Sequence, residues 1–256
     1  MNSPSLLARL ASARVPALSL LAAIATAGAG GAVLADQTRS NSSEAERAGI
    51  ERIVRDYILA NPEIIPEAMT RLQSREATRM LASNRREIET PFAGATAGNP
   101  KGDVTVVVFF DYACPYCKQG ARDIARLAAE DKNLKVVFRD FPVLSPDSET
   151  AALASLSAAS QGRYVRFHDA MFEGSGRLTR ERTIATVRTA GLNEQRTATD
   201  LGSAGLKAEI KRNLDLGRAL GLSGTPSYII GDRILSGAVG LEALKSAVAE
   251  ARAARR

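Results

Sequence analysis

The chain has 256 residues, of which 45% are hydrophobic and 24% charged, so it can bury a full core and is not disordered throughout. The formal net charge of +6 includes Arg9 and Arg14 near the start, and it is too mild to indicate a nucleic-acid partner. The length predicts one main domain with an accessory segment.

The N-terminus has the pattern of an export signal. After the two arginines, residues 15–34 form an apolar run in which leucine and isoleucine give way to alanine, threonine and glycine. We expect cleavage just before Asp36, with a site nearer Ala27 as the second possibility. An uncleaved membrane anchor is the alternative, although Pro16 and the glycine-rich end disfavour it. Residues 1–35 are therefore predicted to be a signal peptide, and the remainder is expected to face an oxidising compartment.

Residues 36–92 are predicted to form an N-terminal helical extension, because apolar residues recur in them at helical spacing. Asn61 and Pro62 resemble a cap and a first helical position, while Pro66 indicates a late or bent start. The apolar stripes are too small to enclose a core, so they pack either on the main domain or on another subunit; we predict self-association. These stripes contain Ile50, Ile53, Val54, Tyr57 and Ile58, then Ile64, Ile65, Ala68, Met69 and Leu72.

Residues 93–256 are predicted to form the main α/β domain. Residues 104–110 are β-branched and aromatic, as in a strand buried on both faces. A Cys-Pro-Tyr-Cys sequence follows, then a helical pattern and a second strand at residues 134–138, which together indicate a βαβ unit with a parallel sheet.

The second half of this domain is predicted to be mainly helical. Residues 146–220 carry far more helical pattern than one crossover needs, so we expect a helical insertion there. Gly231 and Asp232 separate two short apolar runs, which indicates a β-hairpin. A last helix is expected from Leu241 to about Ala254.

The two cysteines, Cys114 and Cys117, stand too close together to connect distant parts of the fold. With His168 as the single histidine, the chain also lacks the ligands of a protein-only zinc site, so we expect neither a metal nor a cofactor. A redox role is favoured by the strand before the pair and the helix after it. The alternative is that the two cysteines bind a metal at the surface or are close together without a function.

The predicted helix start assigns a role to each sulfur. Cys114 would lie at the helix N-terminus, where free N–H groups and the helix dipole favour a nucleophilic thiolate. Cys117, one turn later, would resolve a mixed disulfide formed at Cys114. Pro115 suits the first helical turn, since it loses no hydrogen bond there.

Residues 109–117, Phe-Phe-Asp-Tyr-Ala-Cys-Pro-Tyr-Cys, and residues 224–227, Gly-Thr-Pro-Ser, resemble the DsbA-like family of periplasmic disulfide oxidoreductases, above all its ScsC-like, copper-sensitivity suppressor branch. The similarity extends over residues 50–254. It implies a thioredoxin fold with an inserted helical subdomain, catalytic Cys114 and Cys117, and a cis-proline, Pro226, facing them. Pro115, Tyr116 and Thr225 would contact the client beside Pro226, whereas a plain turn is the alternative for residues 225–226.

Two positions depart from the family pattern. Many thioredoxin-like enzymes carry a buried acid six residues before the first cysteine, where this chain has Val108, and Asp111 cannot be assumed to replace it. Relatives often place a tryptophan where this chain has Val165. His168 is expected to be structural, as a histidine on a helix face usually is.

The resemblance implies a periplasmic enzyme that exchanges disulfides with exported cysteine-containing client proteins, with a DsbD-like or DsbB-like membrane protein as redox partner. We favour isomerase or reductase activity over pure oxidase activity, because Thr225 resembles the isomerase branch and the N-terminal helices could assemble a homo-oligomer. The alternative is a copper-tolerance protein that binds Cu(I) through the same two thiolates.

Overall fold

The computed structural model describes residues 43–255, which divide in the sequence into a first unit up to Met69 and a second unit from Thr70. The predicted signal peptide, its cleavage site and the first residues of the predicted N-terminal extension lie outside the described residues. Among the residues described, no helix is long and apolar enough to cross a membrane.

The first unit is helical, as predicted. Residues 43–60 form one helix, and the next, α2 (Ile64–Glu89), continues into the second unit. Asn61 ends the first helix, since its side-chain amide donates to the Tyr57 carbonyl at 2.9 Å. The helix α2 begins two residues later than we expected from Pro62, and Pro66 lies in its first turn, where a missing N–H leaves no bond unmade.

The second unit is built on a mixed sheet with the strand order β1-β3-β2-β4-β5. The central pair, β2 (Val104–Phe110) and β3 (Leu134–Asp140), is parallel, which confirms the predicted βαβ unit. The predicted hairpin is present as β4 (Ser227–Ile230) and β5 (Arg233–Ser236), with β4 antiparallel to β2. The edge strand β1 (Thr96–Gly98) was not predicted, because three residues are too few to show a periodic pattern.

The sheet is buried on both faces because β2 alternates its side chains between two cores. One face packs on α3 (Pro115–Glu130) and α9 (Leu241–Ala253), the other on α2 and α8 (Ala204–Ala219). The first core includes Val106, Val108, Phe110, Ile124 and Leu244; the second includes Val107, Phe109, Leu81, Ile88 and Leu216.

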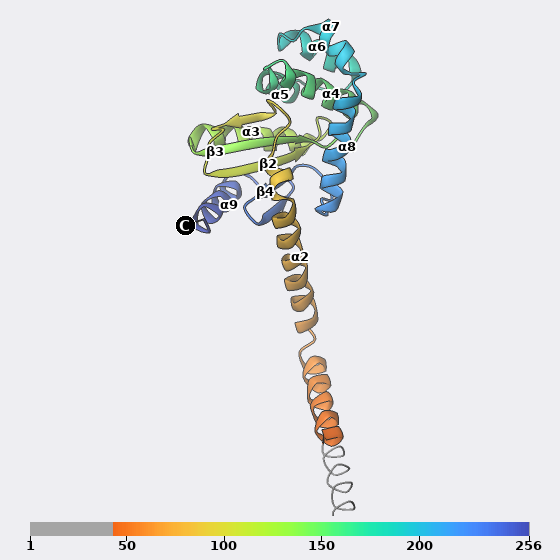
Figure 1. Cartoon of the computed structure of the whole chain (residues 1–256), viewed down its shortest axis with the longest axis vertical. Helices are drawn as coiled ribbons and strands as arrows, with labels where there is room; N and C mark the ends of the chain where they lie inside the picture. The colour runs from red at the N-terminus through yellow and green to blue at the C-terminus, as the bar shows by residue number, and fades with distance from the viewer. Residues whose placement is uncertain (1–42, 256) are drawn as a thin grey trace, which may run out of the picture. The chain divides into compact units, whose positions relative to one another are not determined.

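The insertion between β3 and β4 is helical over the predicted range. It comprises α4 (Pro146–Ser160), α5 (Tyr164–Glu173), α6 (Arg180–Thr189), α7 (Glu194–Asp200) and α8. Figure 1 shows α4 to α7 gathered together, with α8 running back from them alongside the sheet. The thioredoxin fold with a helical insertion and an N-terminal helical extension is therefore confirmed.

A buried arginine ties the end of α2 to the sheet. Arg139 of β3 donates to the Thr90 carbonyl at 2.6 Å, to Asn213 Oδ1 at 2.9 Å and to Glu209 Oε1 at 3.3 Å. Its charge is almost fully enclosed, so each of these partners offsets the cost of desolvating it. The later half of α2 thus belongs to the sheet's core, and the division at Met69 differs from the domain boundary at residue 92 that we expected from the sequence.

Candidate active site

The two cysteines lie where the βαβ unit turns from strand to helix. Cys114 is the N-cap residue of α3, with extended backbone angles, and Pro115 is the first helical residue. The turn is closed by the Cys114 N–H, which donates to the Asp111 carbonyl at 3.0 Å, and by the Cys117 N–H, which donates to the Cys114 carbonyl at 3.1 Å. The predicted position of Cys114 at a helix N-terminus is therefore confirmed.

The loop before β4 approaches the same point from a distant part of the chain. The bond between Thr225 and Pro226 is cis, and the Cys114 thiol donates to the Thr225 carbonyl with an Sγ–O distance of 3.2 Å. The structure thus brings together the two sequence segments that carried the family resemblance.

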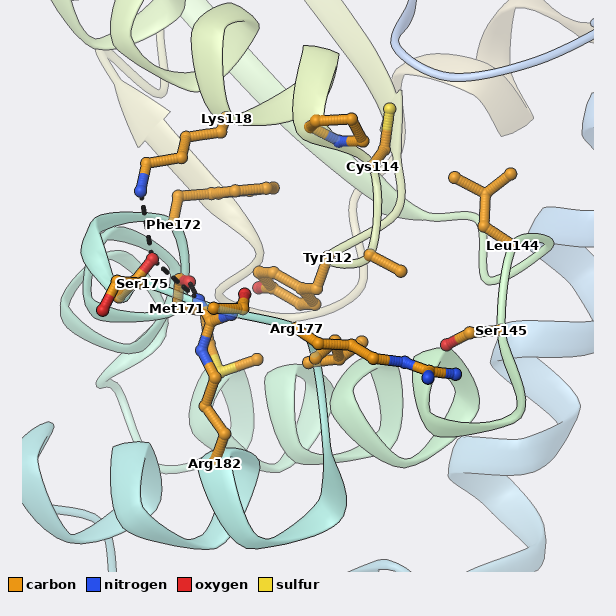
Figure 2. A pocket seen from close by; sticks show the side chains of 15 residues that line it. Tyr112, Cys114, Lys118, Leu144, Ser145, Met171, Phe172, Ser175, Arg177 and Arg182 are labelled. Atoms are coloured by element: carbon orange, nitrogen blue, oxygen red, sulfur yellow. Dashed lines mark hydrogen bonds between the residues drawn. The ribbon is translucent and has the colours of Figure 1, made fainter.

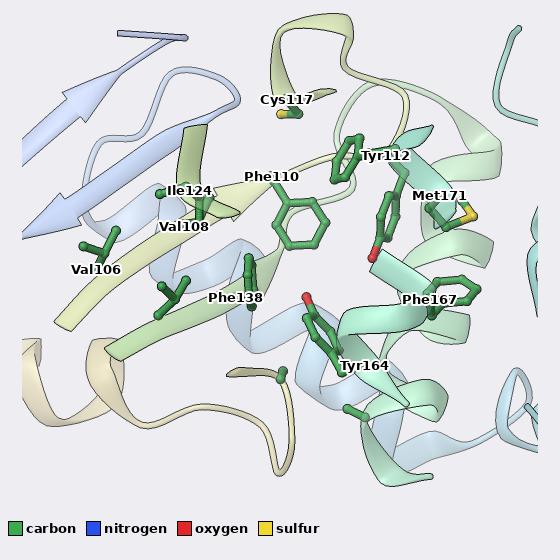
Figure 3. Close-up of a cluster of buried hydrophobic side chains, with 14 of the residues drawn as sticks. Val106, Val108, Phe110, Tyr112, Cys117, Ile124, Phe138, Tyr164, Phe167 and Met171 are labelled. Carbon is green, nitrogen blue, oxygen red and sulfur yellow. The ribbon is translucent and has the colours of Figure 1, made fainter. Parts of the chain in front are cut away.

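The two sulfurs have different surroundings. Both cysteines belong to the buried cluster under α3, with Cys114 4% and Cys117 2% exposed, but only Cys114 lines a pocket (Cys117 is labelled in Figure 3). Burial raises the pKa of the Cys117 thiol, and neighbouring polar groups oppose this only in part. Cys117 is therefore a protonated, shielded thiol at neutral pH.

Asp111 stabilises the loop that precedes Cys114. Its buried carboxylate accepts hydrogen bonds from the N–H groups of Ala113 at 2.8 Å, Val143 at 2.8 Å and Leu144 at 2.9 Å. These bonds join the loop before Cys114 to the loop after β3 and occupy both carboxylate oxygens. An aspartate two residues before Ala113 predicts such a local turn. The sequence gives no indication that the same carboxylate also binds the loop after β3.

His168 of α5 packs against the rings of Phe110, Phe138 and Tyr164. Figure 3 shows these three rings in the buried cluster. Its Nδ1 lies 3.2 Å from the Tyr112 hydroxyl, which also donates to Ser155 Oγ at 3.2 Å; Ser155 in turn donates to Asp140 Oδ2 at 3.3 Å. Burial lowers the pKa of His168 to about 3 and raises the pKa of Asp140 well above its usual range. A permanently neutral imidazole fits the structural role predicted for His168.

The pocket beside Cys114 has a volume of about 470 Å³ (Figure 2). Pro115 lines it, as expected for a residue that contacts the client, whereas Tyr116 is 68% exposed and does not. Sequence reasoning missed most of the lining, because α5, the loop after it and the start of α6 are distant in sequence. The missed side chains include Lys118, Leu144, Met171, Phe172, Arg177 and Arg182.

The described residues contain no group of three or more histidine, cysteine, aspartate or glutamate side chains that could hold a metal ion. The chemistry that the site can support by itself is thiol–disulfide exchange. One thiol stands at a helix N-terminus and lines a pocket, and a second lies one turn behind it.

Comparisons with known proteins agree with this geometry. Residues 105–249 match the model of the DSBA-like thioredoxin domain, and residues 46–78 match that of the copper resistance protein ScsC N-terminal domain. A thioredoxin-like oxidoreductase from Silicibacter pomeroyi is 37% identical, with a TM-score of 0.62, over 65% of this chain and 95% of that one. A linker-deletion mutant of Proteus mirabilis ScsC is 26% identical, with a TM-score of 0.69, over 83% of this chain and 97% of that one.

Among curated relatives, the Na(+)/H(+) antiporter NhaA 1 of Salinispora arenicola is 29% identical over 161 residues, which are 62% of this chain and 25% of that protein. The chain therefore spans about a quarter of the length of the curated relatives it matches. The domain match covers more than half of the chain and includes both cysteines and the cis-proline loop. The chain belongs to the DsbA-like family of thioredoxin-fold thiol-disulfide oxidoreductases, with an N-terminal region of the ScsC type.

Proposed function

We propose that this protein exchanges disulfides with exported cysteine-containing proteins, with Cys114 as the nucleophile and Cys117 as the resolving thiol. The observation that carries the proposal is the asymmetry of the pair. Cys114 caps α3 beside an open pocket, and Cys117 is buried behind it with a raised pKa. Pro115 follows Cys114 and lines the same pocket, and the Thr225 carbonyl before the cis bond to Pro226 accepts the hydrogen bond of the Cys114 thiol. The exposed Tyr116 ring lies on the same turn, so these four residues are the proposed client contacts.

In the reductive direction, the Cys114 thiolate attacks one sulfur of a client disulfide. A mixed disulfide forms, and the client's other sulfur leaves as a thiolate that takes up a proton. Cys117 then loses its proton and attacks Cys114 Sγ, which releases the client's second thiolate. The client has gained two electrons, and the protein now holds a Cys114–Cys117 disulfide. Oxidation of a client is the same sequence reversed.

We favour isomerase or reductase activity over pure oxidase activity. Isomerisation needs a mixed disulfide that lasts long enough for the client to try another pairing, and the burial of Cys117 slows the resolving step. The first unit leaves several apolar side chains uncovered, including Ile53, Leu59 and Met69, which supports self-association into an assembly with several redox sites. In such a cycle, a DsbD-like or DsbB-like membrane protein would restore the active redox state.

Periplasmic action is part of this proposal. It rests on the export-like N-terminal sequence and on a redox pair whose proposed clients keep their disulfides in an oxidising compartment. The experiment that tests the direction is a measurement of the pair's reduction potential, combined with assays on a scrambled and on a fully reduced client. Faster recovery of the scrambled client is the expected result, and faster recovery of the reduced client would assign an oxidase.

The Cu(I)-binding alternative is supported by the two sulfurs and by the similarity of residues 46–78 to the N-terminal domain of the copper resistance protein ScsC. The described residues add no cluster of further ligands to the pair. A Cu(I) titration separates the two functions. Tight binding by a protein that exchanges no disulfides would favour copper binding, and exchange with weak Cu(I) binding would favour the redox function.

A further inference from the structure

The pocket beside Cys114 combines an apolar floor with a positively charged rim. Tyr112, Met171 and Phe172 contribute apolar surface, while Lys118, Arg177 and Arg182 contribute three cations. No aspartate or glutamate is among the residues that line the pocket. The positive charge is therefore not neutralised inside the pocket by an acidic side chain of the described chain.

Two of these cations are held in place by backbone carbonyls. Lys118 Nζ donates to the Gly174 carbonyl at 3.0 Å and to the Glu173 carbonyl at 3.3 Å. Arg182 donates to the carbonyls of Gly176 at 2.8 Å and Gly174 at 3.1 Å. Carbonyl groups orient a cation without cancelling its charge, so both side chains keep a fixed positive charge at the rim (Figure 2).

Arg177 differs from the other two cations. It is exposed, and within the described residues it has neither a hydrogen bond nor an ion pair. In Figure 2 its side chain extends along the pocket in the direction of Ser145. Its guanidinium is therefore available to a ligand, with donors that suit a carboxylate.

The acidic side chains near this pocket do not line it. The buried carboxylate of Asp111 accepts hydrogen bonds from the backbone N–H groups of Ala113 and Leu144. Asp169 and Glu173 line a separate hollow, which shares only Lys118 and Phe172 with the pocket beside Cys114. Neither acid forms an ion pair with Lys118 within the described residues. The N-terminus of α3, which Cys114 caps, adds the positive end of a helix dipole on the same side.

We propose that this pocket binds the client segment next to the reacting cysteine and selects clients that carry an acidic residue there. The proposal rests on the disulfide-exchange function and adds a substrate class to it. A client carboxylate would pair with Arg177 at the rim, while neighbouring apolar side chains of the client lie on Tyr112 and Phe172. Such pairing raises the encounter rate with Cys114 and aligns the client disulfide with its sulfur.

The test uses the reduced full-length protein and two peptides, each with an internal disulfide, that differ only by aspartate or asparagine beside a cysteine. Placing the substitution at successive positions on either side of the cysteine locates the favoured site. We expect the aspartate peptide to be reduced about threefold faster than the asparagine peptide at its best position, as an exposed ion pair allows. This preference should shrink in 0.5 M salt.

In Arg177→Gln, the reduction rate of the aspartate peptide divided by that of the asparagine peptide should be close to one. A general effect of the substitution on Cys114 changes both rates equally and therefore leaves this ratio unchanged. Arg180→Gln is the matched control, because Arg180 is exposed and nearby, carries the same charge and does not line the pocket. It should keep the wild-type ratio. Equal rates for the two peptides at every position, or an equal loss of preference in both variants, would overturn the proposal. Failure to reduce either peptide would instead refute the disulfide-exchange function.

Discussion

The two units of this chain differ in how completely they bury their apolar side chains. In the second unit, β2 buries side chains on both faces of the sheet, and Leu81 and Ile88 of α2 are each only 1% exposed. In the first unit, Ile53 is 69% exposed and Met69 is 56% exposed. A sheet covered by helices on both faces encloses its own core. Two helices alone form apolar stripes but cannot enclose a core. We therefore expect the second unit to fold and react by itself and the first unit to act by association.

The largest expected effect separates the two sulfurs of the second unit. Cys114→Ser should lower disulfide exchange to the uncatalysed level, since the attacking sulfur is lost. Cys117→Ser should keep the first step and accumulate mixed disulfides with clients, because the resolving thiol is gone. Non-reducing gels with mass spectrometry of the trapped species check both results. Equal trapping by the two variants would show that the roles are assigned wrongly.

Alkylation of the reduced wild-type protein near pH 6 provides an independent check of the same asymmetry. The modification should be found at Cys114, because burial shields Cys117 and raises the pKa of its thiol. A predominance of modified Cys117 would contradict the assignment.

Deletion of residues through Met69 tests whether the units are separable. The remaining chain keeps Leu81, Ile88 and the contacts of Arg139, so we expect it to fold and to exchange disulfides. It should be monomeric by light scattering and should lose isomerase activity before reductase activity, because a lone site cannot offer a client a second pairing. A full-length protein that is already monomeric, or a truncated protein that isomerises equally well, would refute the proposed role of the first unit.

Two matched substitutions compare how much a buried and an exposed isoleucine contribute to the free energy of unfolding. Ile88→Ala removes a side chain from the core under the sheet and should lower the free energy of unfolding by about 2–5 kcal/mol. Ile53→Ala removes a mostly exposed side chain of the same size and should change it by less than about 0.5 kcal/mol in dilute solution. Urea unfolding of both variants gives the two values. A similar loss in both would mean that Ile53 is covered in the folded protein.

A pH dependence is also expected inside the second unit. The pKa of His168 is lowered from its ordinary value of about 6.5 to about 3, so only the unfolded chain binds this proton between these values. Stability from the neutral imidazole is complete above about pH 6.5 and is lost as the pH falls, by about 2 kcal/mol between pH 7.5 and pH 5.

The raised pKa of Asp140 acts in the opposite direction, since its proton is held more tightly in the folded state. A comparison of the wild type with His168→Gln cancels this contribution, because both proteins contain Asp140. The variant should lack the loss that His168 causes, in the full-length and in the truncated chain alike. Identical pH profiles for the wild type and the variant would show that His168 titrates normally.

The sequence by itself determined the reacting pair and the secondary structure apart from the three-residue strand β1, because both depend on local signals. Periodicity placed β2, β3, the hairpin and the helical insertion; a buried strand followed by Cys-Pro-Tyr-Cys placed Cys114 at a helix start. Of the distant groups beside the sulfurs, the family resemblance had placed only Thr225 and Pro226, and the tertiary structure decided the rest. The hydrogen bond from the Val143 N–H to Asp111 and the cationic rim each join segments whose separation in sequence carries no periodic signal. The sequence also did not show that one half of α2 is exposed and the other half is part of the core. Apolar residues recur at the same helical spacing whether or not another element covers the face that they form.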